Sequence, residues 1–176
     1  MIKIINNIIE VFIEISKGSS VKYEYDESRQ CLVVDRFLHT SMYYPFNYGF
    51  ITETQSEDGD PIDTLVLTQE TVLPGTIIKT RVIGMLETED ENGQDFKLIN
   101  VPINIIDPDV TEINDIFDVR EATRHKIRHF FEYYKSLEKN KWVKVKDWQG
   151  REKAIAYLIK AKEKFRQSQK NQSKIS

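Results

Sequence analysis

Three aspartates within six residues form the densest group of chemically capable side chains in this sequence. Asp58, Asp60 and Asp63 stand at positions i, i+2 and i+5, with Gly59 and Pro61 between them. Glycine and proline are typical of a tight turn, and the apolar run after Asp63 predicts a buried strand. Converging carboxylates repel one another, by about 1 kcal/mol per pair in water and about 4 kcal/mol at an effective dielectric constant of about 20. A bound cation would relieve this repulsion, and Mg²⁺ suits a site with few carboxylate ligands.

The same acidic turn has a plainer interpretation, because Asp, Gly and Pro are common in solvated loops. A calcium-binding EF-hand loop does not fit, since its glycine stands sixth. Counted from Asp58 as the first position, Gly59 stands second. Pro61 and Leu67 would also occupy the fourth and tenth places of that loop. The rest of the chain must therefore decide between a solvated turn and a metal site.

Further charged residues recur on the predicted strands, on one hairpin and on a predicted helix. Lys97 follows Asp95 by two residues and therefore shares its face of the strand. Taken singly, each of these side chains predicts an ordinary solvated surface. The acidic members are Glu14, Glu24, Asp90 and Asp95, and the basic members are Lys22, Arg36, Lys97 and Lys135.

Two histidines, His125 and His129, stand four residues apart on a predicted helix. That spacing can bind zinc, but the residues between them lack the glutamate of a His-Glu-x-x-His helix. Arg124 and Arg128 further disfavour a bound cation, so we do not expect a metal there. The sequence contains no glycine-rich phosphate-binding motif, and no Ser or Cys has a suitable partner for nucleophilic catalysis.

Composition predicts one soluble globular domain over residues 1–176. Hydrophobic residues make up 40% of the chain and charged residues 30%, and the net charge is −3, so no general attraction to nucleic acid or anionic membranes is expected. Segment 1–15 is rich in isoleucine but is interrupted by polar residues and lacks a cleavage site, and no segment is apolar enough to span a membrane. The lone cysteine, Cys31, excludes an intrachain disulfide, and its apolar neighbours predict a buried position. We expect a cytoplasmic protein.

The elements that must position these side chains change type along the chain. Alternating apolar and polar residues predict strands near 11–16, 21–25, 31–35, 65–67, 76–87 and 96–102. Segment 1–10 predicts a short helix or turn, and Asn92-Gly93 predicts a hairpin turn. Strands followed by helices indicate an α+β fold, with a small antiparallel β-barrel flanked by two main C-terminal helices.

Helical periodicity begins beyond Pro108. A short helix is predicted over 110–116, and a longer one with a capping box whose cap is Asp118. The apolar stripe of that longer helix runs from Ile127 to Leu137, and a final helix carries a stripe from Ala154 to Phe165. Segment 142–148 predicts an exposed strand or loop between them, and the polar segment 167–176 predicts a flexible tail.

In this order, the segments resemble the family I soluble inorganic pyrophosphatases, in particular those of the bacterial branch. The strongest match is residues 58–63, close to the family pattern Asp-small-Asp-Pro-apolar-Asp. Thr64 departs from the pattern, and the loop between Glu14 and Lys22 is one residue shorter. Supporting matches fall within residues 11 to 165, at 12–15, 22–24, 34–36, 44–49, 90, 95–97 and 130–135.

The resemblance implies an OB-like barrel, a homohexamer and hydrolysis of inorganic diphosphate to two phosphates. The reaction would depend on several Mg²⁺ ions per site, with in-line attack by a metal-activated water. Asp60 would act as the general base. The resemblance assigns metal binding to Asp58, Asp63, Asp90, Asp95, Glu14 and Glu24. It assigns substrate binding to Lys22, Arg36, Tyr48, Lys97, Tyr134 and Lys135.

Two other functions remain open from the residues alone. A non-catalytic barrel could bind single-stranded nucleic acid through stacking rings, supplied by Tyr43, Tyr44, Phe46, Tyr48 and Phe50, although the negative charge disfavours it. A two-metal hydrolase could also act on a nucleotide or phosphodiester instead of diphosphate.

Overall fold

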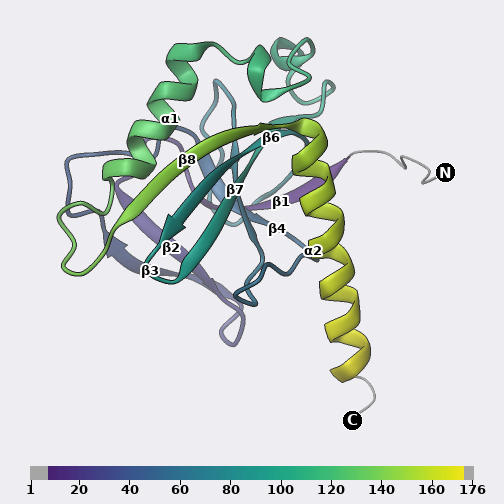
Figure 1. Ribbon diagram of the computed structural model, residues 1–176, viewed down its shortest axis with the longest axis horizontal. Coiled ribbons are helices and arrows are strands. Elements are labelled where there is room, and N and C mark those ends of the chain that lie inside the picture. The colour runs from purple at the N-terminus through teal and green to yellow at the C-terminus, as the bar shows by residue number, and fades with distance from the viewer. Residues whose placement is uncertain (1–7, 173–176) are drawn as a thin grey trace.

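Figure 1 shows a computed structural model of the chain, which describes residues 8–172. Strands come first and helices later, as the sequence predicted. The strands are β1 Ile9–Ile15, β2 Val21–Asp26, β3 Cys31–Phe37, β4 Asn47–Ile51, β5 Ile62–Val66, β6 Ile77–Asp90, β7 Gly93–Pro102 and β8 Val143–Gly150. The α-helices are α1 Glu121–Tyr133 and α2 Arg151–Gln172, and two 3-10 turns lie at Pro108–Val110 and Ile116–Asp118.

Five strands close into the predicted small barrel. They pair in the order β1-β4-β5-β7-β6, and β6 pairs back onto β1, while β8 extends the sheet beyond β6. All of these pairings are antiparallel except β5 with β7, where Thr64 lies opposite Leu98 in parallel. The predicted antiparallel barrel is therefore confirmed, with β5 and β7 as its one parallel pair. The strand between these two in sequence, β6, turns back through a hairpin, so β7 reaches β5 in the same direction as β5 itself.

The second and third strands form a separate two-stranded hairpin beside the barrel (Figure 1). The backbone amide of Tyr25 donates to Glu14 Oε1 at 2.8 Å, which ties this hairpin to β1. Strand β2, whose pairing with β3 shifts register between Lys22 and Tyr23, contributes Lys22 and Glu24 to the cavity, together with Tyr23 and Tyr25. This hairpin therefore forms one wall of the candidate site.

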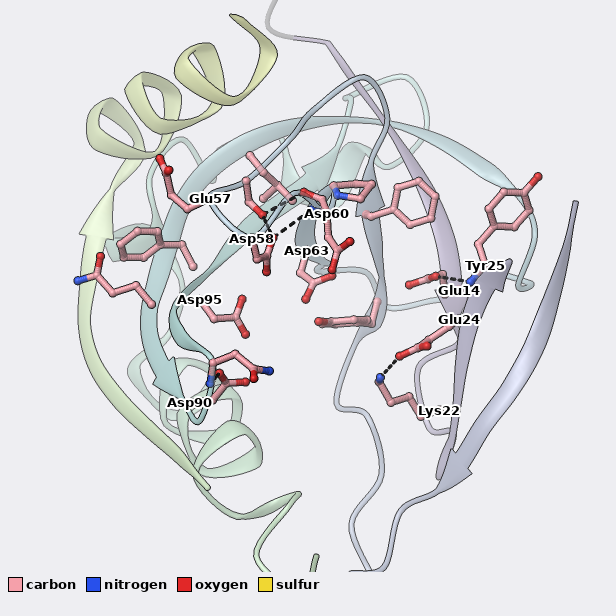
Figure 2. A pocket seen from close by; sticks show the side chains of 18 of the residues that line it. Glu14, Lys22, Glu24, Tyr25, Glu57, Asp58, Asp60, Asp63, Asp90 and Asp95 are labelled. Carbon is pink, nitrogen blue, oxygen red and sulfur yellow. Dashed lines mark hydrogen bonds and ion pairs between the residues drawn. The ribbon is translucent and has the colours of Figure 1, made fainter. Parts of the chain in front are cut away.

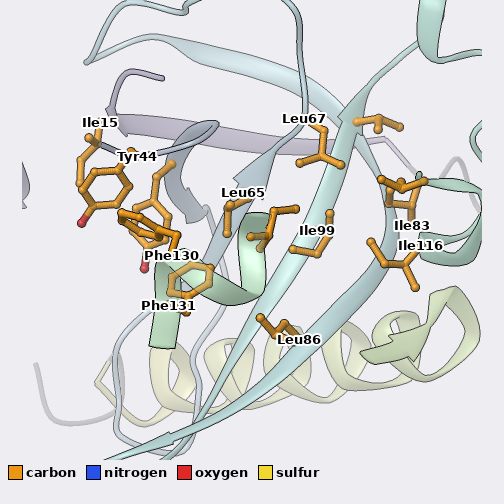
Figure 3. Packing of buried hydrophobic residues seen from close by; sticks show 14 of the residues in the cluster. Ile15, Tyr44, Leu65, Leu67, Ile83, Leu86, Ile99, Ile116, Phe130 and Phe131 are labelled. Carbon is orange, nitrogen blue, oxygen red and sulfur yellow. The ribbon is translucent and has the colours of Figure 1, made fainter. Parts of the chain in front are cut away.

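Two apolar clusters hold the helices on the barrel. In the first, Phe130 and Phe131 of α1 pack beside Tyr44 and Leu65 (Figure 3). In the second, Ala154, Leu158 and Ala161 of α2 pack against residues of β1, β5 and β6. Burying one such aromatic or aliphatic side chain contributes about 1.5–3 kcal/mol. These contacts confirm the predicted α1 stripe at Phe130 and Phe131, and the α2 stripe over about two turns from Ala154 to Ala161.

Several local predictions were wrong at element ends. Asp118 is the N3 residue of a capping box whose N-cap is Asp115, and this box begins a 3-10 turn rather than α1. Residues 110–116 do not form one helix, because the two 3-10 turns lie at its edges. Helix α1 ends at Tyr133, so Leu137 lies beyond it and is 68% exposed.

The remaining differences lie near the ends of the chain and at the cysteine. Strand β1 begins at Ile9, inside the segment predicted as a helix or turn, whereas residues 1–7 of that segment lie outside the described residues. Helix α2 continues to Gln172, so the predicted disorder is wrong over 167–172. Cys31 is exposed, because it starts β3 in the two-stranded hairpin rather than in the barrel. None of the described helices is long and apolar enough to cross a membrane.

Candidate functional site

An acidic cavity of about 740 Å³ opens between the barrel, the β2–β3 hairpin and α2 (Figure 2). Lys22 is the only lysine or arginine among the described residues that line it. Nine carboxylates face the same space, from Glu14, Glu24, Glu27, Glu57, Asp58, Asp60, Asp63, Asp90 and Asp95. The structure therefore brings together all seven of the acidic residues that the sequence singled out.

The loop before β5 places the first two aspartates, as predicted, on a tight turn. Gly59 has a φ of +101°, which favours glycine over residues with a side chain. The backbone amide of Ser56 donates to the Asp60 carbonyl oxygen at 2.8 Å. Asp58 Oδ1 accepts hydrogen bonds from the Ser56 hydroxyl and, at 3.0 Å, from the Asp60 amide. The third aspartate, Asp63, lies on β5 itself.

A buried lysine joins the two acidic strands. Lys97 Nζ lies 2.5 Å from Asp63 Oδ2 and 2.7 Å from Asp95 Oδ2, and its side chain is 5% exposed. Burial opposes the charge on Lys97, but the two carboxylates outweigh burial and raise its pKa. For Asp63, burial alone would raise the pKa, but Lys97 and a hydrogen bond from Tyr48 hold that pKa below its ordinary value. The predicted shared face of Asp95 and Lys97 is confirmed.

Asp60 has a different environment from its two neighbours. Partial burial, followed by the charges of Asp58 and Asp63, raises the pKa of Asp60 above its ordinary value. A carboxylate with a raised pKa is a stronger proton acceptor than an ordinary aspartate. The three aspartates are therefore chemically distinct, with Asp60 the more basic and Asp63 ion-paired.

Glu14 is a strongly perturbed carboxylate of the cavity. Burial raises its pKa to about 7, against the lowering effect of the Tyr25 amide. The unfolded chain ionises this group near its ordinary value, whereas the folded protein holds its proton to a higher pH. The contribution of Glu14 to folding stability is therefore largest at low pH and is lost as pH rises through about 7.

Replacing Glu14 with glutamine should remove that loss. In EDTA, we expect the urea midpoint of the wild type to fall more between pH 5 and pH 8 than that of Glu14→Gln. Glu24→Gln is the matched control, because the Glu24 side chain is 53% exposed, and it should keep the wild-type slope. Identical slopes for the wild type and Glu14→Gln would contradict the burial of Glu14 as the cause.

Arg36 is connected to the cavity only indirectly, through Asp35 and Lys22. Lys22 Nζ lies 3.4 Å from Asp35 Oδ2 and is also paired with Glu24. Asp35 pairs in turn with Arg36, whose Nε donates to Glu138 Oε1 at 2.9 Å. Arg36 does not line the cavity, but this chain of ion pairs connects it to Lys22.

The predicted aromatic and basic residues after α1 lie behind the cavity wall. Lys135 Nζ is 3.2 Å from Asp90 Oδ2. Tyr134 is buried, with its ring 4.9 Å from that of Phe130, and burial raises its pKa. Tyr48 lines the cavity, whereas Tyr134 and Lys135 do not. The structure thus brings Lys135 to the acidic group through Asp90, while Tyr134 is held in the core.

Sequence reasoning did not single out several residues of this region. Asp35 adjoins Arg36, but its type and position did not predict a role, and Glu138 lies 102 residues from its partner Arg36. The α2 residue Tyr157 lines the cavity and packs edge-on against Phe96, with ring centroids 5.0 Å apart. No local pattern pairs such distant positions, so these residues were not accessible from the sequence.

The chemistry of the donors fits a hard divalent cation. The described residues that line the cavity include neither histidine nor cysteine, and their carboxylate oxygens are the ligands that Mg²⁺ prefers. Within residues 8–172, no three His, Cys, Asp or Glu side chains already converge as a preformed metal site. On α1, His125 Nε2 lies 3.6 Å from Glu121 Oε1, and the ring of His129 lies tilted 5.0 Å from that of Tyr133.

Comparisons with known proteins agree on one family. The family model described as inorganic pyrophosphatase matches residues 11–166. An inorganic pyrophosphatase of Saccharolobus solfataricus is 55% identical over 159 residues, covering 90% of this chain and 92% of the relative. The solved inorganic pyrophosphatase of Helicobacter pylori is 48% identical, covers 91% of this chain and 94% of its own, and superposes with a TM-score of 0.89. That of Thermus thermophilus is 41% identical, with a TM-score of 0.89 over 93% of this chain and 94% of its own. This chain therefore belongs to the inorganic pyrophosphatase family of hydrolases.

Proposed function

We propose that this chain hydrolyses inorganic diphosphate to two phosphates with Mg²⁺. The observation that carries the proposal is the charge of the cavity, where nine carboxylates and one lysine line a single space. Such a lining repels a bare polyanion and therefore favours one that enters with cations. A small, highly charged phosphoanhydride that travels with Mg²⁺ has that chemistry.

Asp58, Asp63 and Asp95 would hold the activating Mg²⁺ ions, and Asp90, Glu14 and Glu24 would hold ions brought with the substrate. When bound, these ions would neutralise phosphoryl charge and lower the pKa of coordinated water. Asp63 and Asp95 are joined through Lys97, so the positions of these two carboxylates are coupled before any ligand binds. The hydrogen bonds to Asp58 Oδ1 fix the direction of that carboxylate.

Asp60 would accept the proton of the attacking water. Its raised pKa, caused first by burial and then by Asp58 and Asp63, supports this role over an ion-paired carboxylate. Its backbone amide is bound to Asp58, so the base and a ligand share one rigid turn. This arrangement supports in-line attack from the side of the 56–60 loop.

The basic side chains would stabilise the phosphoryl groups. Lys22 lines the cavity and would face the attacked phosphoryl group together with Tyr48. Arg36, Lys97, Tyr134 and Lys135 would act toward the leaving phosphate, since Arg offers two parallel donors and Lys a point charge. In the structure, Arg36 and Lys135 are paired with Glu138 and Asp90, so substrate would compete for these cations.

The packing of the aromatic rings argues against the alternative function of binding single-stranded nucleic acid. Tyr44 and Tyr48 are buried, with ring centroids 5.4 Å apart, and Phe50 stacks on Phe12. These three rings are occupied by packing contacts and do not form a continuous stacking surface, whereas Tyr43 is 61% exposed. The cavity beside them is acidic, which opposes a nucleic-acid backbone.

We further infer a cytoplasmic homohexamer without nucleic-acid or membrane partners. Family membership supports the assembly, and the formal net charge of −3 supports the absence of a polyanionic or anionic-membrane partner.

Phosphate release from diphosphate tests the proposal. With Mg²⁺, the purified chain should release two phosphates per diphosphate consumed, and EDTA should abolish turnover. Ca²⁺ should inhibit, because its looser coordination binds without holding the reacting groups in position. No phosphate release at any Mg²⁺ concentration would contradict the proposal.

A further inference from the structure

The C-terminal helix holds the loop that carries Asp58 and Asp60. Lys164 Nζ donates to the Ser56 carbonyl oxygen at 2.7 Å, and it lies 3.4 Å from Glu57 Oε2. Three residues earlier on the helix, the Ala161 carbonyl oxygen accepts a hydrogen bond at 3.1 Å from the backbone amide of Gln55, the residue before Ser56. Helix α2 thus binds the backbone of this loop at two successive residues.

Ser56 connects those contacts to the two aspartates. Its hydroxyl donates to Asp58 Oδ1 and lies 3.0 Å from the Asp60 carbonyl oxygen. Its amide donates to the same Asp60 carbonyl at 2.8 Å. A displacement of Ser56 would therefore move both carboxylates, and Lys164 is the side chain that fixes Ser56 from outside the loop.

The same face of α2 also reaches the strand that carries Asp95. Tyr157, Ala161 and Lys164 stand at i, i+4 and i+7 and therefore share one face of the helix. Tyr157 packs against Phe96, the residue after Asp95, with an interplanar angle of 75°. In Figure 2, α2 passes beside Glu57, next to the group of Asp58, Asp60 and Asp95.

We propose that Lys164 is a positioning residue that orients the 56–60 loop for Mg²⁺ binding and turnover. The inference rests on the proposed function for its kinetic consequences but not for its effect on metal binding. Lys164 does not line the cavity, so it would act through Ser56 rather than by touching metal or substrate. Misplacement of a ligand by about 1 Å is enough to cost a large factor in rate.

If Lys164 acted only through its positive charge, its removal would change Mg²⁺ affinity in the opposite direction. Removing a positive charge near an acidic loop should strengthen cation binding slightly, and the effect is small because the Lys164 side chain is 38% exposed. Removing a positioning contact should instead weaken cation binding. The sign of the change therefore separates the two explanations.

The test measures Mg²⁺ affinity by isothermal titration calorimetry, together with kcat and KM for diphosphate, on the full-length chain. Lys164→Met should weaken Mg²⁺ binding and lower kcat/KM by about tenfold, with the thermal midpoint within about 2 °C of wild type. Lys164→Arg should restore both within about threefold, because its guanidinium can donate to the same carbonyl.

Lys160→Met is the matched control. Lys160 is 74% exposed and contacts only Glu57 Oε1 among the loop atoms, at 3.4 Å, so this variant removes the same charge without the backbone contact. It should bind Mg²⁺ as tightly as wild type, or slightly more tightly. Ser56→Ala, which removes the hydroxyl on Asp58, should weaken Mg²⁺ binding, and its effect should not add to that of Lys164→Met.

Unchanged or tighter Mg²⁺ binding in Lys164→Met would overturn the inference, as would an equal loss in Lys160→Met. A wild type that binds Mg²⁺ but does not hydrolyse diphosphate would contradict the proposed function instead. In that case the calorimetric comparison still decides the role of Lys164, because it requires no turnover.

Discussion

Replacing Asp60 with asparagine is expected to lower kcat for diphosphate by about 10²–10⁴-fold, the range for loss of a general base. Asparagine keeps the shape of the side chain but cannot accept the proton of the attacking water. The backbone amide of residue 60 would still bind Asp58 Oδ1, so the turn should remain intact. Steady-state kinetics at saturating Mg²⁺ measure kcat, and calorimetry measures Mg²⁺ affinity, which should stay within about threefold of wild type.

Asp58→Asn is the matched control for this variant, because it makes the same chemical change two residues away. Loss of a metal ligand should mainly raise the Mg²⁺ concentration that activity requires, whereas loss of the general base should lower kcat at saturating Mg²⁺. If Asp60→Asn kept the kcat of wild type, or if Asp58→Asn lost the larger share of kcat at saturating Mg²⁺, the assignment of the base would be wrong.

Lys97→Met is expected to destabilise the metal-free protein by about 3 kcal/mol, the lower end of the range of about 3–5 kcal/mol for breaking a buried ion pair. The lower part applies because Asp63 and Asp95 are 35% and 31% exposed to the cavity, although Lys97 itself is 5% exposed. Without the ammonium group, two close carboxylates repel each other. Their pKa values rise above those of the unfolded chain, so the deficit should shrink as pH falls from 7 toward 4.

Urea denaturation in EDTA measures this effect. Mg²⁺ should recover part of the lost stability by replacing the missing positive charge between the two aspartates. Lys146→Met is the control, because the pair of Lys146 with Glu89 is 31% and 37% exposed and such pairs contribute about 0–1 kcal/mol. A Lys97→Met protein as stable as Lys146→Met in EDTA would contradict the role of Lys97 as the cation between Asp63 and Asp95.

The acidic half of the site could be predicted because its signals are local. The Gly and Pro between Asp58, Asp60 and Asp63 predicted the turn, and the apolar run after Asp63 predicted β5. Strand alternation placed Asp95 and Lys97 on one face, and their carboxylate-to-ammonium distance of 2.7 Å confirms it. Each of these inferences used residues at most ten apart.

The features that sequence reasoning missed depend on distant pairing. No local pattern makes β5 run parallel to β7, where Thr64 pairs with Leu98. The contact of Lys164 with Ser56 spans 108 residues. Cys31 shows the converse error, since its apolar neighbours indicated a core strand but β3 lies in a two-stranded hairpin with much of its surface exposed. Local periodicity predicts which residues form a strand, but not which neighbours cover it.

Phosphate release by the wild type from diphosphate and from ATP, compared in parallel under Mg²⁺, tests the central claim most directly. Asp60→Asn serves as the catalytic control in both reactions. The expected result is rapid release of two phosphates per diphosphate, much slower release from ATP, and loss of the diphosphate reaction in Asp60→Asn. Turnover of ATP as fast as that of diphosphate, or no release from diphosphate, would contradict the assignment of this cavity to diphosphate hydrolysis.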